Sequence, residues 1–256
     1  MSTDIKMIVT DLDGTLLRTD KTVSERVICV LHRCREAGVK VVYATGRGGS
    51  AELVAPTGLF DGKITGNGAI AEISGSIVYS RRIPHKTAQP VLTACNERGI
   101  KVGSDSGDTH YTNFVVPEIW SYITGFVITD FSQHEKDSDK IYMLNPTPED
   151  KKFIVSMLPD TLYYVETVDT EGFLGHIMHK DATKGNAVAE LARLWGISQH
   201  EIVTFGDDLN DIDMLSYAGI GVAMENALDE VKAVADVVCP SNDDDGIAVW
   251  IEANLL

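Results

Sequence analysis

The N-terminal part of the chain constrains the fold more than any other part. Residues 6–11 form a nearly continuous apolar run, which is typical of a buried strand in a parallel sheet, and residues 39–44 repeat this pattern. Between them, residues 23–38 carry apolar side chains at helical spacing, with Ser24 as the expected N-cap and Gly38 as the expected C-cap. A strand, a helix and a second strand with short connections form a parallel βαβ unit. This part therefore predicts an α/β fold with an open parallel sheet.

The alternation of strands and helices is interrupted once. Between residues 82 and 179 the predicted order is a helix followed by strands, then a second helix followed by a strand pair, which indicates an α+β layer. The alternation of strands and helices resumes with a helix that begins at Lys184. We therefore predict a Rossmann-like, doubly wound core formed by residues 1–81 and 180–256, interrupted by an inserted α+β domain of residues 82–179.

Composition narrows the range of partners. The chain has 256 residues and a formal net charge of −16, so its overall field repels nucleic acid and anionic membrane surfaces, and we expect neither as a partner. No apolar run approaches the roughly 18 residues that span a bilayer, and the N-terminus lacks the pattern of a secretory signal. The four cysteines show no zinc-binding spacing. These features favour a cytoplasmic protein with free thiols; its oligomeric state is unknown.

Polar residues follow three of the predicted strands. Asp-Leu-Asp-Gly-Thr-Leu occupies residues 11–16, Thr45 follows the second strand, and Gly-Asp-Asp-Leu-Asn-Asp at residues 206–211 follows the apolar run 202–205. One such residue alone would more often be a helix N-cap. The carboxyl ends of parallel strands share one edge of a sheet, however, and ligands bind at that edge. Carboxylates gathered there repel one another unless a cation or a shared proton intervenes, so the pattern indicates a metal site.

These motifs resemble, without a substitution, those of the haloacid dehalogenase superfamily of phosphohydrolases. The layout is similar to the Cof-type branch, subclass IIB, which carries a large inserted cap of the C2 type. The resemblance implies that the core performs the chemistry and that the cap closes over the substrate and selects its leaving group. The segments that carry it are residues 11–16, Ala-Thr-Gly-Arg at 44–47, Asn-Gly-Ala at 67–69, Lys184-Gly185, residues 206–211 and Asp245-Gly246.

The resemblance implies roles for the acidic residues. Asp11 would be the nucleophile that forms an aspartyl-phosphate, and Asp13 would be the general acid for the leaving alcohol and then the base for water. Mg²⁺ would bind Asp11, the backbone carbonyl of Asp13 and Asp207, with Asp211 supporting the ion directly or through other ligands. For Asp208, a capping role and a catalytic role both stay open.

Phosphate binding is expected from a second group of residues. Thr45 and Gly46 are predicted to lie at the start of a helix, where a hydroxyl and free backbone N–H groups would bind an anion. By resemblance, Lys184 would steady the nucleophile and the phosphoryl oxygens with its positive charge. Asn210 is expected to hold Lys184 or the phosphate, and Arg47 is interpreted as structural.

The sequence therefore predicts a magnesium-dependent phosphatase that acts on small phosphorylated metabolites. Alternatives within enzymes are a phosphomutase or a phosphatase dedicated to phosphoglycolate or one sugar phosphate. From another class, the chain could be a phosphoacceptor switch, although such a switch needs neither an acid such as Asp13 nor a large insertion. His176 and His179 point to opposite faces of a predicted strand and make a poor chelating pair. Whether one of them faces the substrate stays open, as does the choice between magnesium and manganese.

Overall fold

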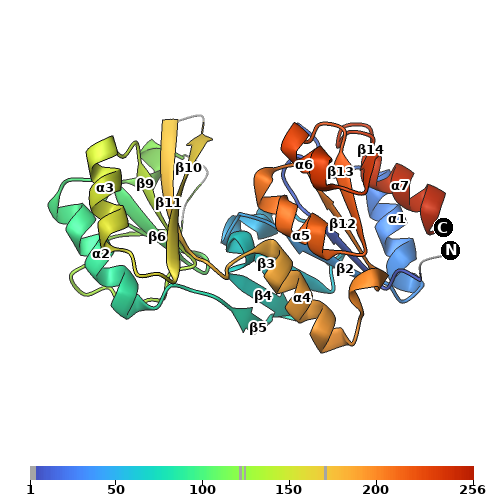
Figure 1. Ribbon diagram of the computed structural model, residues 1–256, viewed down its shortest axis with the longest axis horizontal. Helices are drawn as coiled ribbons and strands as arrows, with labels where there is room; N and C mark the ends of the chain where they lie inside the picture. The colour runs from blue at the N-terminus through green and yellow to red at the C-terminus, as the bar shows by residue number, and fades with distance from the viewer. Residues whose placement is uncertain (1–3, 121–122, 124, 170–171) are drawn as a thin grey trace. The chain divides into compact units, whose positions relative to one another are not determined.

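The computed structural model describes residues 4–120, 123, 125–169 and 172–256, and the chain divides into two compact units (Figure 1). The core unit comprises Met1–Arg47, Ala51–Ser80 and Thr183–Leu256, and the insert unit comprises Gly48–Ser50 and Arg81–Ala182. The insert unit therefore begins one residue earlier and ends three residues later than the segment 82–179 that the sequence suggested. The short glycine-rich segment Gly48–Ser50 also groups with the insert unit.

The core unit is built on an eight-stranded sheet with the order β14-β13-β12-β1-β2-β3-β4-β5. The strands from β14 to β3 are parallel, and β4 and β5 add an antiparallel hairpin. The strand bounds are β1 Met7–Thr10, β2 Lys40–Ala44, β3 Gly62–Thr65, β4 Ile70–Ile73, β5 Ser76–Ser80, β12 Ile202–Gly206, β13 Ile220–Met224 and β14 Val237–Cys239. Because β1 lies between β2 and β12, motifs from both ends of the chain meet at one edge of the sheet.

Helices cover both faces of this sheet. Ile8 packs in an apolar cluster with residues of α1 and α7, whereas its neighbours Met7 and Val9 pack in a second cluster with residues of α4. The strand β1 is thus buried on both sides, which explains its continuous apolar run. The helix bounds are α1 Glu25–Glu36, α4 Lys184–Trp195, α5 Ile212–Tyr217, α6 Asp229–Val234 and α7 Gly246–Asn254.

The insert unit has a six-stranded sheet with the order β10-β11-β9-β6-β7-β8, antiparallel except for the pair β7 and β8. An apolar cluster joins this sheet to the helices α2 and α3. The bounds are α2 His85–Glu97, β6 Val102–Ser106, β7 Thr109–Thr112, β8 Phe126–Ile128, β9 Lys140–Leu144, α3 Pro148–Met157, β10 Leu162–Asp169 and β11 Gly172–His179.

The predicted fold class, a doubly wound α/β core with an inserted α+β domain, is confirmed. The prediction did not include the short edge strand β8, nor α7, whose largely apolar sequence shows no helical amphipathic pattern. Among the described helices, none has the length and apolar character needed to cross a membrane.

A tight turn between β3 and β4 connects two loops of the core unit. Asn67 has a positive φ of 56°, and its backbone N–H donates to the carbonyl of Thr45 at 3.0 Å. Gly68 has φ +93°, and a Cβ at this position would lie 2.1 Å from the carbonyl oxygen of Thr183, the residue that precedes α4. Only glycine fits at position 68, because both the backbone conformation and the space exclude a side chain.

We expect Gly68→Ala to lower the free energy of unfolding by about 3 kcal/mol or more, because a strained φ and a backbone clash combine. The matched control is Gly75→Ala, since Gly75 has φ +76° but no heavy atom within 4 Å of the added Cβ. The control should lose only about 1–2 kcal/mol for the left-handed conformation. Urea unfolding of both variants measures the difference; equal losses would contradict this account of the turn.

Candidate active site

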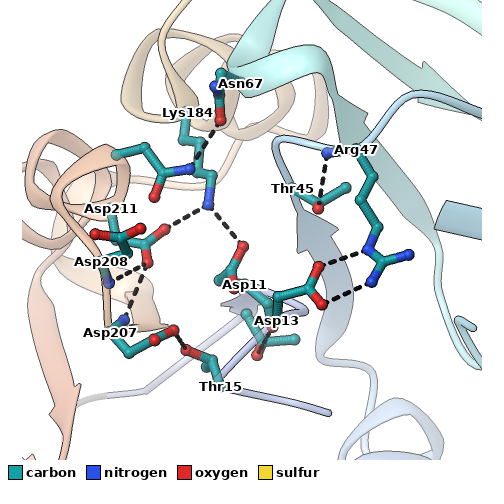
Figure 2. A network of polar contacts seen from close by, with 12 residues as sticks. Asp11, Asp13, Thr15, Thr45, Arg47, Asn67, Lys184, Asp207, Asp208 and Asp211 are labelled. Atoms are coloured by element: carbon teal, nitrogen blue, oxygen red, sulfur yellow. Dashed lines mark hydrogen bonds and ion pairs between the residues drawn. The ribbon is translucent and has the colours of Figure 1, made fainter. Parts of the chain in front are cut away.

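Three acidic residues converge at the carboxyl ends of β1 and β12 (Figure 2). Asp11 follows β1 directly, Asp207 follows β12 directly, and Asp211 ends the short helical turn Leu209–Asp211. One carboxylate oxygen from each residue lies within 4.8 Å of those of the other two. Asp11 and Asp211 are buried and Asp207 is half-buried. Sequence motifs almost 200 residues apart therefore form one cluster of carboxylates.

Lys184, the first residue of α4, supplies the positive charge of this cluster. Its ammonium donates to Oδ1 of Asp11 at 2.7 Å and to Oδ1 of Asp211 at 2.6 Å, and its side chain is 0% exposed (Figure 2). Burial alone lowers the pKa of Lys184, but the two carboxylates outweigh burial and raise the pKa above its usual range. The ammonium is therefore charged, and it fixes the side chain of Asp11.

Asp211 also organises the loop that carries Asp207. Its second oxygen, Oδ2, accepts hydrogen bonds from the backbone N–H groups of Asp207 at 3.0 Å and Asp208 at 3.1 Å. The side chain of Asp208 is exposed and accepts from the backbone N–H of Leu209 at 2.7 Å. Of the two roles left open for Asp208, these contacts match the capping role.

The charges of the cluster fit a divalent cation. Burial raises the pKa of Asp11 well above its usual range, and Asp211 and Asp207 add to this rise, while Lys184 opposes it. Burial also raises the pKa of Asp207 to about 7, although the hydroxyl of Thr15 donates to Oδ1 of Asp207 at 2.6 Å. One ammonium does not balance three carboxylates. The atoms that could bind a cation here are all hard carboxylate oxygens. These residues therefore fit Mg²⁺, the ion that the sequence predicted.

Asp13 lies beside this cluster, and its side chain is held by two cations. Nη2 of Arg47 donates to Oδ1 of Asp13 at 2.7 Å, Nε of Arg47 binds the other oxygen, and the ammonium of Lys21 lies 2.9 Å from Oδ1. Burial raises the pKa of Asp13, but the hydrogen bonds from Arg47 and Lys21 outweigh it and lower the pKa to about 2. Arg47, which the sequence left as structural, thus contacts an expected catalytic side chain directly.

The expected helix after Thr45 is wrong in detail. Thr45 and Gly46 lie in a bend, and the first helical turn, Gly49–Leu53, is a short 3₁₀ segment that begins three residues later. Three glycines at positions 46, 48 and 49 disfavour an α-helix here. The Thr45 hydroxyl is buried and accepts from the backbone N–H of Arg47 at 3.1 Å. A phosphate at this loop would therefore not meet an α-helix N-terminus.

Asn210 has a different partner from the one expected. Its Nδ2 donates to Oδ1 of Asn67 at 2.8 Å, whereas the ammonium of Lys184 is held by carboxylates. Gly46 lies against the same Asn67 carbonyl, since a Cβ at Gly46 would be 2.8 Å from it. Asn67 is therefore a residue of the site to which the sequence analysis gave no role. The motif at residues 67–69 was the sequence feature that could have indicated it. Phosphate binding by Asn210 stays a prediction.

The two histidines of β11 make separate local contacts in the insert unit. Nε2 of His176 lies 2.9 Å from the hydroxyl of Thr167, and Nδ1 of His179 accepts from the backbone N–H of Asp181 at 3.1 Å. Each ring therefore has its own hydrogen-bond partner.

We expect Lys184→Met to lower the free energy of unfolding in chelator by about 3–5 kcal/mol at neutral pH, because it leaves two buried carboxylates without their shared cation. Lys63→Met is the matched control. Lys63 also binds two carboxylates, those of Glu52 and Glu72, but its side chain is 25% exposed. Its loss should be under about 1 kcal/mol.

The loss of unfolding free energy caused by Lys184→Met should also depend on pH. Without the ammonium the pKa of Asp11 rises further, because Lys184 lowers it in the wild type. The folded variant then binds protons more readily than the unfolded chain, so its stability increases as pH falls, and the deficit shrinks from about pH 8 to about pH 5. Denaturant unfolding across this range measures it; a deficit that grows on acidification would refute the charge assignment.

Comparison with known proteins agrees with this geometry. The family of haloacid dehalogenase-like hydrolases matches residues 8–251. YxeH of Bacillus subtilis (strain 168) is 31% identical over 264 residues, which cover 95% of this chain and 96% of YxeH. BT1666 from Bacteroides thetaiotaomicron, a phosphatase of this superfamily, has a TM-score of 0.81 at 26% identity, covering 97% of this chain and 94% of BT1666. The subclass IIB sugar phosphatase BT4131 has a TM-score of 0.79 at 28% identity, covering 97% and 98%.

The chain therefore belongs to the haloacid dehalogenase-like hydrolases. The resemblance that its motifs carry is confirmed, and so is the prediction of an enzyme of the phosphatase class of this superfamily.

Proposed function

We propose that this hydrolase is a magnesium-dependent phosphatase that cleaves small phosphomonoesters through an aspartyl-phosphate on Asp11. The observation that carries the proposal is the contact between the Lys184 ammonium and Asp11, 2.7 Å apart in a buried site beside Asp207 and Asp211. A buried carboxylate held by a lysine and adjoining further carboxylates is suited to attack a phosphoryl group, provided that a cation offsets the negative charge.

The divalent ion would be held by the carboxylates of Asp11 and Asp207 and by the backbone carbonyl of Asp13. Asp211 would steady this arrangement, since its oxygens already hold Lys184 and the backbone of Asp207. A bound Mg²⁺ would offset the negative charge that the nucleophile and the phosphoryl oxygens bring together.

In the first step, a carboxylate oxygen of Asp11 attacks phosphorus and forms a P–O bond. The bond between phosphorus and the ester oxygen breaks, and that oxygen takes a proton from Asp13 and leaves as an alcohol. In the second step, water attacks the same phosphorus and gives a proton to Asp13. The bond between phosphorus and Asp11 then breaks, which releases inorganic phosphate and restores both side chains.

Asp13 must change partners for this cycle. A carboxyl group whose pKa is about 2 carries no proton at neutral pH, and Arg47 and Lys21 hold Asp13 in that ionised form. Asp13 can therefore donate a proton only after its contacts with Arg47 and Lys21 weaken. We propose that the phosphate of the substrate competes for these cations, so that Asp13 becomes an acid only when a substrate is present.

The relatives support a phosphorylated sugar or polyol as the substrate class. BT4131 is a sugar phosphatase. YcsE and YitU of Bacillus subtilis (strain 168), 28% and 25% identical to this chain, are named 5-amino-6-(5-phospho-D-ribitylamino)uracil phosphatases. We propose that the insert unit acts as the cap that selects among such leaving groups.

The sequence-based alternatives differ from this proposal in their products. A phosphomutase would return an isomeric phosphate ester instead of free phosphate, because it must protect its aspartyl-phosphate from water. A dedicated phosphatase would accept one ester in a broad panel. A phosphoacceptor switch would accumulate the phosphorylated protein without turnover. The expectations of a cytoplasmic location and of no nucleic-acid or membrane partner rest on composition alone and are part of the proposal.

We expect phosphate release from a panel of sugar phosphates, polyol phosphates, phosphoglycolate and nucleotides to require Mg²⁺ and to stop in chelator. Asp11→Asn should lower turnover at least about 10³-fold, because the amide is a poor nucleophile and breaks the contact with Lys184. Asp244→Asn, a change on an exposed loop of the core unit, is the matched control and should retain activity. Phosphate release that persists in Asp11→Asn would remove the nucleophile from the proposal.

Asp13→Asn should separate substrates by their leaving groups. With a sugar phosphate, whose alkoxide needs a proton, we expect turnover to fall about 10²–10⁴-fold. With p-nitrophenyl phosphate, whose phenolate leaves without strong protonation, the first step should slow much less. Burst-phase kinetics with both esters measure this step directly. An equal loss with both esters would argue against Asp13 as the general acid.

A further inference from the structure

We infer that Asn226 is a positioning residue for the cation site, a role that rests on the proposed function and lies outside the motifs of the sequence analysis. Asn226 lies in the turn after β13, is exposed, and donates from Nδ2 to the carbonyl oxygen of Gly14 at 2.7 Å. Two residues later, the backbone N–H of Leu228 donates to the carbonyl oxygen of Asp207 at 3.0 Å. One turn thus holds both loops that carry the proposed ligands of the ion.

The carbonyl that Asn226 binds belongs to a peptide in contact with Asp207. Gly14 has φ +80°, and a Cβ at this position would lie 2.2 Å from Oδ2 of Asp207. The next residue, Thr15, donates its hydroxyl to Oδ1 of Asp207 at 2.6 Å. Thr15 therefore holds Oδ1 of Asp207, and the backbone of Gly14 closely approaches Oδ2, so a rotation of the peptide that joins these two residues would disturb the side chain of Asp207.

The amide of Asn226 is itself oriented by a neighbouring loop. Its Oδ1 accepts from the backbone N–H of Asn242 at 3.0 Å, which directs Nδ2 toward Gly14. The side chain of Asn242 donates separately to the carbonyl oxygen of Leu17 at 2.9 Å, further along the first loop. The chain thus offers two asparagine contacts to one loop: Asn226 binds the peptide that joins Gly14 and Thr15, the two residues beside Asp207, whereas Asn242 binds Leu17, whose backbone pairs with Asp13.

Replacing Asn226 by alanine removes the hydrogen bond that holds the peptide between Gly14 and Thr15. Because the side chain of Asn226 is exposed, few packing contacts are lost at the same time. Residues that orient metal ligands without binding the ion contribute about 10–100-fold to metal affinity. Asn226→Ala should therefore weaken Mg²⁺ binding by about 10-fold or more, lower turnover at limiting Mg²⁺, and recover when Mg²⁺ is in excess. The KM for the phosphate ester at saturating Mg²⁺ should not change.

The test is calorimetric titration of Mg²⁺ into the substrate-free full chain, with thermal unfolding in chelator measured in parallel. Asn242→Ala is the control, because it removes a similar side-chain hydrogen bond but keeps the backbone N–H that holds Asn226. We expect Asn226→Ala alone to lose Mg²⁺ affinity, with both variants equally stable in chelator.

Several outcomes would overturn the inference. Unchanged Mg²⁺ affinity in Asn226→Ala would do so, as would equal losses in the two variants or an Asn226→Ala chain that unfolds in chelator, since these indicate a structural contact. Failure of the wild type to bind Mg²⁺ would instead remove the proposed function, and the inference with it, so the two failures are distinguishable.

Discussion

The site depends on one buried ammonium. Lys184 is fully enclosed and stays charged because Asp11 and Asp211 both accept its hydrogen bonds, and the same contact opposes the rise that burial causes in the pKa of Asp11. Removing either partner from such a buried group exposes the other to the full penalty of an unpaired charge. This mutual dependence fixes the side chain of Asp11 before any substrate arrives, and groups that are oriented in advance do not need to reorganise during the reaction.

The fold supplies the rest of the arrangement through a few loops at one edge of the core sheet. The pairing of β1 with β12 brings the two acidic loops side by side, and α4 begins at Lys184, which binds a carboxylate of each loop. Two turns then hold these loops together: the turn with Asn67 binds the Thr45 backbone and Asn210, and the turn with Asn226 binds the Gly14 and Asp207 backbones. The sheet thus places the loops of the site beside one another, and the two turns hold them at a fixed spacing.

The sequence predicts what depends on local pattern. The start of α4 at Lys184 matches the prediction, and the cap residue Ser24 binds the N–H of Val27 as expected, because each depends on neighbouring residues. The placement of Asp11 beside Asp207 followed from sheet topology. The contacts from Arg47 to Asp13 and from Asn226 to Gly14 join residues far apart in sequence, and no periodic pattern marks such pairs. The helix expected to start at Thr45 and Gly46 does not form, because the glycines at positions 46, 48 and 49 disfavour it.

The central claim is that Asp11 takes the phosphoryl group from the ester. Rapid acid quenching of the wild-type enzyme during turnover of a sugar phosphate, followed by peptide mass spectrometry, tests it most directly. The account predicts a phosphoryl adduct on the peptide that contains Asp11, which forms within the first turnover and disappears once the ester is consumed. Steady phosphate release with no adduct on that peptide at any quench time, or with an adduct on another side chain, would contradict it.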